Sequence, residues 1–173
     1  YYDSAISYVN AHAEILADNV RAEVYKAVIY GNMGTVYLVK GIDDTAEMLY
    51  KKSIEVNSRK GNIIYENRDA VLTKIKLARL YLYGKRYTEL KGLLDELHKD
   101  LEQIPAKEIE RDWNQLMYQY YDYADNPQTA YNYYKSFIHI RDSLSTANKG
   151  RSENDMRKEL TLKEQEYRIG LLE

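Results

Sequence analysis

The sequence lacks cysteine and has little proline, phenylalanine or tryptophan. Its 173 residues include no Cys, two Pro, one Phe and one Trp. Without cysteine the chain can form no disulfide and no thiolate site, which leaves its cellular compartment open. Both prolines, Pro105 and Pro127, stand where a helix is expected to end or to begin. No run of about 18 apolar residues occurs, so we expect no membrane contact within this chain.

The chain also lacks an excess of either charge. It has 25 Lys and Arg residues against 27 Asp and Glu residues, a formal net charge of −2. A nucleic-acid-binding domain, or one that binds an anionic membrane, ordinarily needs a basic surface to offset the phosphate charge. We therefore expect no nucleic-acid partner.

Catalytic and metal-binding motifs are absent as well. The histidines, His12, His98 and His139, fit no H-E-x-x-H or His/Cys/carboxylate spacing, and no G-x-S-x-G, P-loop or G-x-G-x-x-G motif occurs. His139 precedes Asp142 by three residues, which suits either a base with its orienting acid or a helix-surface pair; we favour the pair. The sequence predicts no enzyme, no metal and no cofactor.

Tyrosine and helical periodicity dominate what remains. The chain has 19 Tyr residues and no sustained alternation of the kind that predicts strands, so we expect an all-α fold. The tyrosines could line a ligand groove, or they could pack the seams between helices with their hydroxyls at the surface; we favour packing. Those at or near repeating core positions are Tyr30, Tyr37, Tyr50, Tyr81, Tyr121 and Tyr134.

One spaced pattern organises the chain between residues 27 and 60. A hydrophobic residue and a glycine are followed by a tyrosine and then by an Ala-x3-aromatic segment: Met33, Gly34, Tyr37, Ala46, Tyr50 and Ser53. Two antiparallel helices can approach closely where Gly34 of one faces Ala46 of the other. Residues 41–44 form the predicted turn, with Gly41 ending the first helix and an aspartate as N-cap of the second.

Two further copies of this pattern follow. The second contains Leu77, Ala78, Tyr81, Leu90, Leu94 and Leu97, with a turn at Gly84-Lys85-Arg86-Tyr87. The third contains Met117, Tyr118, Tyr121, Ala130, Tyr134 and Phe137, with a turn at Asp125-Asn126-Pro127. Leu90 and Tyr118 are larger than the Ala and Gly of the first copy, and Leu90 should hold its helix pair slightly farther apart.

The spacing resembles that of tetratricopeptide repeat (TPR) proteins, whose repeat is about 34 residues long. The resemblance implies an all-α fold of antiparallel helix pairs in a right-handed superhelix, followed here by a charged C-terminal helix. Because a solenoid should not begin halfway through a repeat, we expect further repeats before Tyr1. The expected organisation is a repeat domain over 1–144, with an unpaired helix at 1–18 and repeats at 27–60, 71–104 and 111–144, and then the charged helix over 145–173.

The resemblance also implies a binding surface for a protein or peptide. In TPR proteins the first helices line the concave side, where the polar residues between the packing positions face the ligand. Here these residues are Asn32, Thr35, Lys76, Arg79, Gln115, Gln119 and Asp122. Lys76 and Arg79 could grip a carboxylate of an extended peptide. The alternative is a solvated polar face without a ligand.

The last third of the chain resembles a narrower group, the periplasmic TPR sensor portions of bacterial membrane-anchored signalling proteins. Three segments carry this resemblance: Ala130-x-x-Tyr133-Tyr134-Lys135, Ile138-x-x-Arg141-Asp142-Ser143-Leu144 and Glu166-Tyr167-Arg168-Ile169-Gly170-Leu171-Leu172. Such proteins place a membrane span after the charged helix and then a histidine kinase, as in two-component systems, or a DNA-binding output domain. The resemblance implies a periplasmic sensor. The alternative is a free-standing cytoplasmic scaffold.

The charged C-terminal helix has one narrow apolar stripe. Its members, Met156, Leu160, Tyr167 and Leu171, fall within about 60° of one another at 100° per residue, narrower than the face of a helix docked on a core. Near-heptad spacing fits a two-helix contact, so we expect a stalk that extends from the repeats and forms a weak homodimer. The alternative is that the helix folds back and caps the solenoid.

Overall fold

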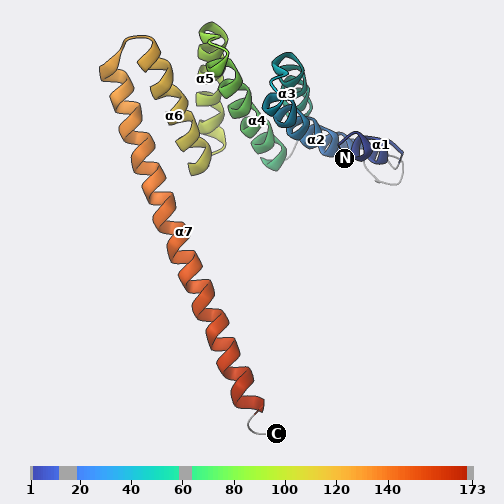
Figure 1. The fold of residues 1–173 in the computed structure, drawn as a ribbon, viewed down its shortest axis with the longest axis vertical. Helices are drawn as coiled ribbons and strands as arrows, with labels where there is room; N and C mark the ends of the chain where they lie inside the picture. The colour runs from blue at the N-terminus through green and yellow to red at the C-terminus, as the bar shows by residue number, and fades with distance from the viewer. Residues whose placement is uncertain (1, 12–18, 59–63, 171–173) are drawn as a thin grey trace.

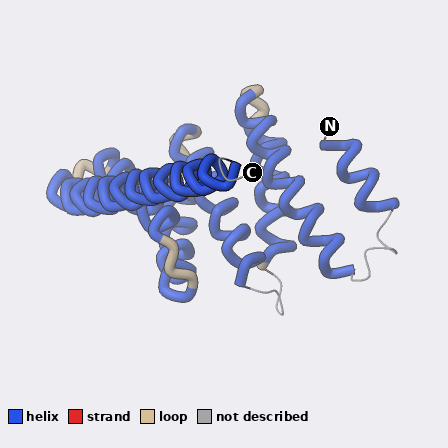
Figure 2. Tube along the Cα trace, turned by 90° about the horizontal axis from the view of Figure 1, so that it is seen from below, coloured by secondary structure: helices blue, strands red, loops and turns tan. Residues whose placement is uncertain are grey.

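The computed structural model describes residues 2–11, 19–58 and 64–170, and within these ranges the chain is helical, with no strand (Figures 1 and 2). The all-α fold class is therefore confirmed. The helices are α1 (Tyr2–Ala11), α2 (Asn19–Val39), α3 (Asp43–Asn57), α4 (Ile64–Tyr83), α5 (Tyr87–Gln103), α6 (Lys107–Tyr123) and α7 (Pro127–Gly170). None of the helices that the structure describes is long and apolar enough to cross a membrane.

From α2 onward the helices form consecutive hairpins. Helices α2 and α3, α4 and α5, and α6 and α7 each pack together, and Figure 1 shows these pairs side by side in chain order. Between the pairs, α3 contacts α4 and α5 contacts α6, while the first helices α2, α4 and α6 contact one another in succession. Helix α1 packs on α2, which places it ahead of the first hairpin. The same neighbour relations therefore join the first hairpin to the second and the second to the third.

The same turn closes all three hairpins. Its middle residue has a positive φ, at Gly41 (72°), Lys85 (56°) and Asp125 (52°). The N–H of the next residue donates to a carbonyl five residues earlier, from Ile42 to Tyr37 (3.0 Å), Arg86 to Tyr81 (2.8 Å) and Asn126 to Tyr121 (3.0 Å). This is the Schellman arrangement, which satisfies carbonyls at the end of the first helix. Each first helix is thereby stopped in the same way.

One detail of these turns differs from the sequence prediction. Asp43 is the first residue of α3, and Ile42 occupies the N-cap position without a side-chain hydrogen bond, so the predicted aspartate cap is wrong. Asp43 and Asp44 instead lie in the first helical turn, where the helix dipole favours negative charge. In the second turn the left-handed residue is Lys85 and not Gly84, because the Schellman geometry requires that conformation at the second residue after the helix.

The close helix contact predicted for the first hairpin is present. Gly34 is buried, and a Cβ built there would lie 3.2 Å from the Ala46 carbonyl oxygen and 2.7 Å from ring carbons of Tyr50. Ala46 and Tyr50 are completely buried, and the Tyr50 hydroxyl donates to Thr35 Oγ1 at 3.2 Å. At Gly31, one turn earlier, a Cβ would lie 3.1 Å from Ser53 Oγ. Small residues thus let α2 and α3 approach.

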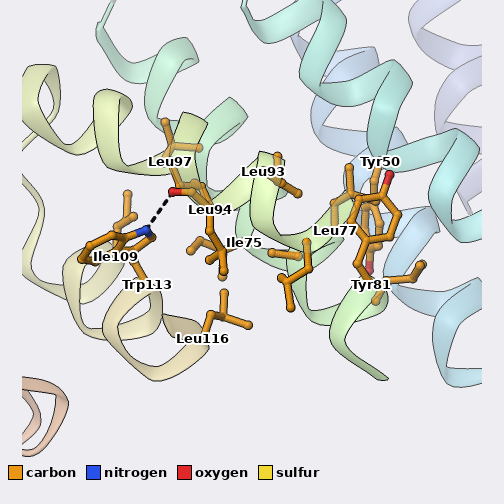
Figure 3. Packing of buried hydrophobic residues seen from close by; sticks show 14 of the residues in the cluster. Tyr50, Ile75, Leu77, Tyr81, Leu93, Leu94, Leu97, Ile109, Trp113 and Leu116 are labelled. Carbon is orange, nitrogen blue, oxygen red and sulfur yellow. Dashed lines mark hydrogen bonds between the residues drawn. The ribbon is translucent and has the colours of Figure 1, made fainter. Parts of the chain in front are cut away.

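The main core lies in helices α3 to α6 (Figure 3). Leu90, Leu94 and Leu97 of α5 are fully buried, as the leucine spacing predicts. Trp113 of α6 packs into the same cluster, and its indole Nε1 donates to the Leu94 carbonyl oxygen at 3.0 Å. That hydrogen bond satisfies the one polar atom of the indole and fixes α6 against α5.

The second and third hairpins replace the glycine contact with larger groups. In the second, Ala78 and Leu90 are both completely buried. In the third, the ring of Tyr118 lies edge-on to Tyr134 with centroids 5.5 Å apart, and 6.1 Å from the centroid of Phe137. Aromatic rings therefore pack between α6 and α7, where a glycine would instead have let the two helix backbones approach closely.

Of the six tyrosines predicted at or near core positions, two are buried and the others are partly buried or exposed. Tyr50 and Tyr81 are buried, Tyr37 and Tyr121 are partly buried against the core cluster, and Tyr134 is 43% exposed. The hydroxyls of the two buried tyrosines are not at the surface. The Tyr50 hydroxyl donates a hydrogen bond to Thr35, and the Tyr81 hydroxyl donates one to Glu47.

Helix α7 is one continuous helix from Pro127 to Gly170. Asn126 caps its start, because its side-chain oxygen accepts the Thr129 N–H at 3.2 Å. Its beginning packs on α6, and the remainder extends away from the hairpins (Figure 1), with every side chain from 151 to 162 exposed. Of the predicted apolar stripe, Met156 and Leu160 are exposed, whereas the Tyr167 side chain and Leu171 lie outside the part that the structure describes.

We predict that Gly34→Ala lowers the free energy of unfolding by about 1–3 kcal/mol, because the new methyl group meets the pinned ring of Tyr50. Helix propensity alone would favour alanine by about 1 kcal/mol. The matched control is Gly92→Ala in α5, where a Cβ would meet nothing within 4 Å. There the higher helix propensity of alanine should raise the free energy of unfolding. Urea unfolding measures both changes. Equal stabilisation by the two substitutions would contradict the close α2–α3 contact.

Candidate functional site

The residues predicted to face a ligand lie on the first helices of the hairpins. Asn32 and Thr35 are on α2, Lys76 and Arg79 on α4, and Gln115, Gln119 and Asp122 on α6. Because α4 contacts both α2 and α6, these helices form one continuous layer. Asn32, Thr35 and Asp122 are exposed, whereas the others are half-buried.

Arg79 is already engaged in an ion pair. Its Nη2 lies 3.1 Å from Oδ2 of Asp112 on α6, and Arg111 Nε donates to Oδ1 of the same carboxylate at 2.7 Å. Asp112 is largely buried between them, with 17% of its side chain exposed. This contact joins α4 to α6, so a ligand carboxylate would have to compete with Asp112 for the Arg79 guanidinium.

Unlike Arg79, Lys76 is not paired with a carboxylate among the described residues. It is half-buried, and burial lowers the pKa of its ammonium group while the nearby Asp69 carboxylate acts in the other direction. Among the described residues it forms no hydrogen bond and no ion pair within 4 Å. A half-desolvated ammonium group without a close counter-ion gains more from an incoming anion than a fully hydrated lysine does. Lys76 is therefore the stronger candidate of the predicted pair.

Thr35 is tied to its own hairpin. Its hydroxyl donates to the Gly31 carbonyl oxygen at 3.1 Å and accepts from the Tyr50 hydroxyl at 3.2 Å. The side chain therefore helps to hold α3 against α2, and both hydrogen bonds would have to rearrange before its hydroxyl could contact a ligand in a new orientation.

A groove that the sequence analysis missed opens between α3, α4 and α5. It has a volume of about 390 Å³, and its lining combines apolar and charged side chains: Lys51, Ile54, Glu55, Lys74, Leu77, Tyr81, Glu89, Gly92, Leu93 and Glu96. Gly92 makes room for it, since a Cβ there would meet nothing within 4 Å. A glycine within the leucine-rich helix 87–103 was the available signal in the sequence.

Glu47 contacts two of the residues that line this groove, Lys51 and Tyr81, and joins the first two hairpins. The Tyr81 hydroxyl donates to its Oε1 at 2.9 Å, Lys51 Nζ lies 2.7 Å from the same atom, and Arg86 pairs with Oε2. The Arg86 guanidinium also lies 4.5 Å from the centroid of the Tyr81 ring. Only 12% of the Glu47 side chain is exposed, so these contacts act where water screens them poorly.

The hydrogen bond from Arg86 is the main cause of a strongly lowered Glu47 pKa, about 2 against an ordinary value of 4.5. Burial raises this pKa, and the contacts with Lys51 and Tyr81 lower it further. Burial, reinforced by the Glu47 carboxylate, also raises the pKa of the Tyr81 hydroxyl. Glu47 therefore stays ionised over the physiological range and acts as a fixed anion that holds α3 to α4 and to the turn at Arg86.

Among the described residues, no three His, Asp or Glu side chains form a cluster that could hold a metal ion. The candidate acid for His139 is otherwise engaged, since Asp142 accepts from Arg141 Nε at 3.0 Å. Comparison with known proteins adds nothing to this geometry: no family model, no curated protein and no solved structure matches the chain.

We predict that Glu47→Gln removes an acid-sensitive part of the stability. A lowered carboxyl pKa contributes stability that is full above about pH 4.5 and is lost as the pH falls toward about 2. The contribution is on the order of 2–3 kcal/mol. Urea unfolding between pH 2.5 and 6 should show a steeper decline for the wild type than for Glu47→Gln. As the control, Glu153→Gln on exposed α7 should keep the wild-type slope; equal slopes for all three proteins would refute the assignment.

Proposed function

We propose that this chain is a TPR-type helical repeat domain that binds a protein or peptide. The observation that carries the proposal is the threefold recurrence of one Schellman turn at Gly41, Lys85 and Asp125, each joining a first helix to the second helix packed on it. Stacked hairpins with identical connections offer an extended, rigid surface, which suits recognition of another chain better than turnover of a small substrate. We propose neither enzymatic activity nor a cofactor.

The proposed ligand surface is the layer formed by α2, α4 and α6. Lys76 supplies a half-buried cation that forms no ion pair with any residue in the described part of the chain, and Arg79 supplies a second cation, which is paired with Asp112. These two side chains lie three residues apart on one helix, a separation that places them on neighbouring parts of one face. An acidic side chain or a C-terminal carboxylate of an extended peptide is the ligand group that this pair fits.

We predict that Lys76→Ala/Arg79→Ala weakens peptide binding at least tenfold, because each charge-assisted hydrogen bond contributes about 1.5–3 kcal/mol. Peptides selected from a random library with free C-termini supply the ligand, and fluorescence anisotropy measures their affinity. The matched control is Lys52→Ala/Lys99→Ala, which removes the same charge from exposed positions on second helices. Unchanged affinity in the Lys76/Arg79 variant would move the site away from this layer.

We further propose that the domain is the periplasmic sensor portion of a bacterial membrane-anchored signalling protein. The support is the continuity of α7, whose first part packs on α6 and whose remainder projects from the hairpins without a break (Figure 1). A shift of α6 on ligand binding would be carried along such a helix toward an output domain. A free-standing cytoplasmic scaffold remains the competing proposal, and it requires no role for the projecting segment.

The sensor proposal includes a homodimer through the projecting part of α7. Met156, Leu160 and Leu162 are 59%, 56% and 59% exposed, and the first two belong to the narrow stripe that fits a two-helix seam. We predict a weak dimer by sedimentation equilibrium that Met156→Glu/Leu160→Glu abolishes. Because neither residue packs on the hairpins, the melting temperature should stay within a few degrees. The polar-face control is Asn154→Glu/Lys158→Glu. A monomeric wild type at all concentrations would exclude a dimer of this chain.

A further inference from the structure

A basic pocket lies where α7 passes beyond the beginning of α6. The pocket encloses about 490 Å³, within the range of small-ligand sites. Arg111 of α6 and Arg141 and Lys149 of α7 supply its charged walls. No carboxylate is among the residues that line it. The pocket contains none of the residues predicted to contact a peptide, but its Arg111 and Arg79 of the proposed peptide site bind the same Asp112 carboxylate. Polyanion binding and peptide binding are measured separately, so the failure of one proposal does not decide the other.

The remaining lining residues complete a site for oxyanions. Ser145, Asn148 and Ser152 contribute hydroxyl and amide groups that can donate hydrogen bonds, and Leu144 contributes the apolar wall. Residues 141, 145, 148, 149 and 152 recur at helical spacing, so one face of α7 presents both the cations and the neutral donors. Charged donors, neutral donors and a pocket without carboxylates form the combination that recognises phosphate or carboxylate groups.

The arginines keep donors for a ligand although each has an acidic neighbour. Arg111 uses Nε and Nη2 on Asp112, and Arg141 uses Nε and Nη2 on Asp142. Each guanidinium has five N–H donors in a planar fork, so Nη1 takes part in neither pair. Asp112 is shared with Arg79, and Asp142 is 62% exposed, so neither carboxylate neutralises its arginine fully. Lys149 forms no ion pair with any residue that the structure describes.

We propose that this pocket binds a small polyanion with at least two phosphate or carboxylate groups. One group would lie between Arg111 and Arg141, which come from different helices, and the other toward Lys149 and the serine and asparagine side chains farther along α7. A bound polyanion would link the beginning of α6 to the part of α7 that leaves the hairpins. A single small anion such as chloride cannot span both positions and would bind far more weakly.

Isothermal titration calorimetry with sodium pyrophosphate and, separately, sodium citrate tests the proposal at constant ionic strength, with sodium chloride as the reference. At least one polyanion should bind the wild type with a dissociation constant below about 1 mM and should raise the melting temperature. Arg111→Gln and Arg141→Gln should each weaken binding about tenfold. Lys149→Gln changes an exposed side chain and should weaken it several-fold without affecting the fold.

Arg151→Gln and Lys158→Gln are the matched controls, since each removes one positive charge from exposed positions of α7 outside the pocket. Their affinity should stay within about twofold of the wild type. Binding of both polyanions supports an oxyanion site, and binding of one identifies whether phosphate or carboxylate geometry is preferred. The proposal is overturned if neither polyanion binds, or if the control variants lose as much affinity as the pocket variants.

Discussion

The architecture depends on one backbone constraint, the left-handed residue that follows each first helix. At Gly41, Lys85 and Asp125 the chain reverses within a few residues, and the second helix can only run back along the first. Only the first of these residues is glycine; at Lys85 the conformation costs about 1–2 kcal/mol, whereas aspartate, as at Asp125, adopts it more readily. The packing that the reversal permits offsets this cost. The turn also positions Arg86 beside Glu47, which links neighbouring hairpins.

Once the chain has reversed, the distance between the two helices of a hairpin is set by the size of the side chains at the point where the helices cross. Gly34 brings α2 close enough for the ring of Tyr50 to lie against its backbone, whereas Tyr118 meets Tyr134 and Phe137 ring to ring. The chain therefore repeats its connections but not its crossing residues. Shared turns with individually packed crossings explain why the pattern can be recognised in the sequence while the copies differ so much in residue type.

Local features were the ones that the sequence could predict. The fold class, the burial of Leu90, Leu94 and Leu97, and the Gly34 contact follow from helical spacing and from the size of side chains. The N-cap assignment failed because one left-handed residue shifts the helix start, and aspartate suits both the cap and the first turn equally well. Pairings between hairpins, such as Arg79 with Asp112, depend on the relative placement of helices far apart in sequence, which spacing does not encode.

Helix α7 combines two physically different segments in one element. Up to the region of Ile140, which is buried, tertiary packing on α6 stabilises it, whereas from 151 to 162 no side chain is buried. Isolated helices of that length are marginal in water, so the projecting segment depends on its continuity with the packed part and on any contact it makes outside this chain.

At 1.5 Å per residue, the 20-odd residues beyond the hairpins reach roughly 30–40 Å. Over that distance a tilt of about 5° at α6 displaces the far end by roughly 3 Å, provided that the helix remains intact. A partner along α7 would therefore serve both purposes at once: it would supply the burial that the segment lacks, and it would keep the helix stiff enough for a change at the hairpins to reach its end.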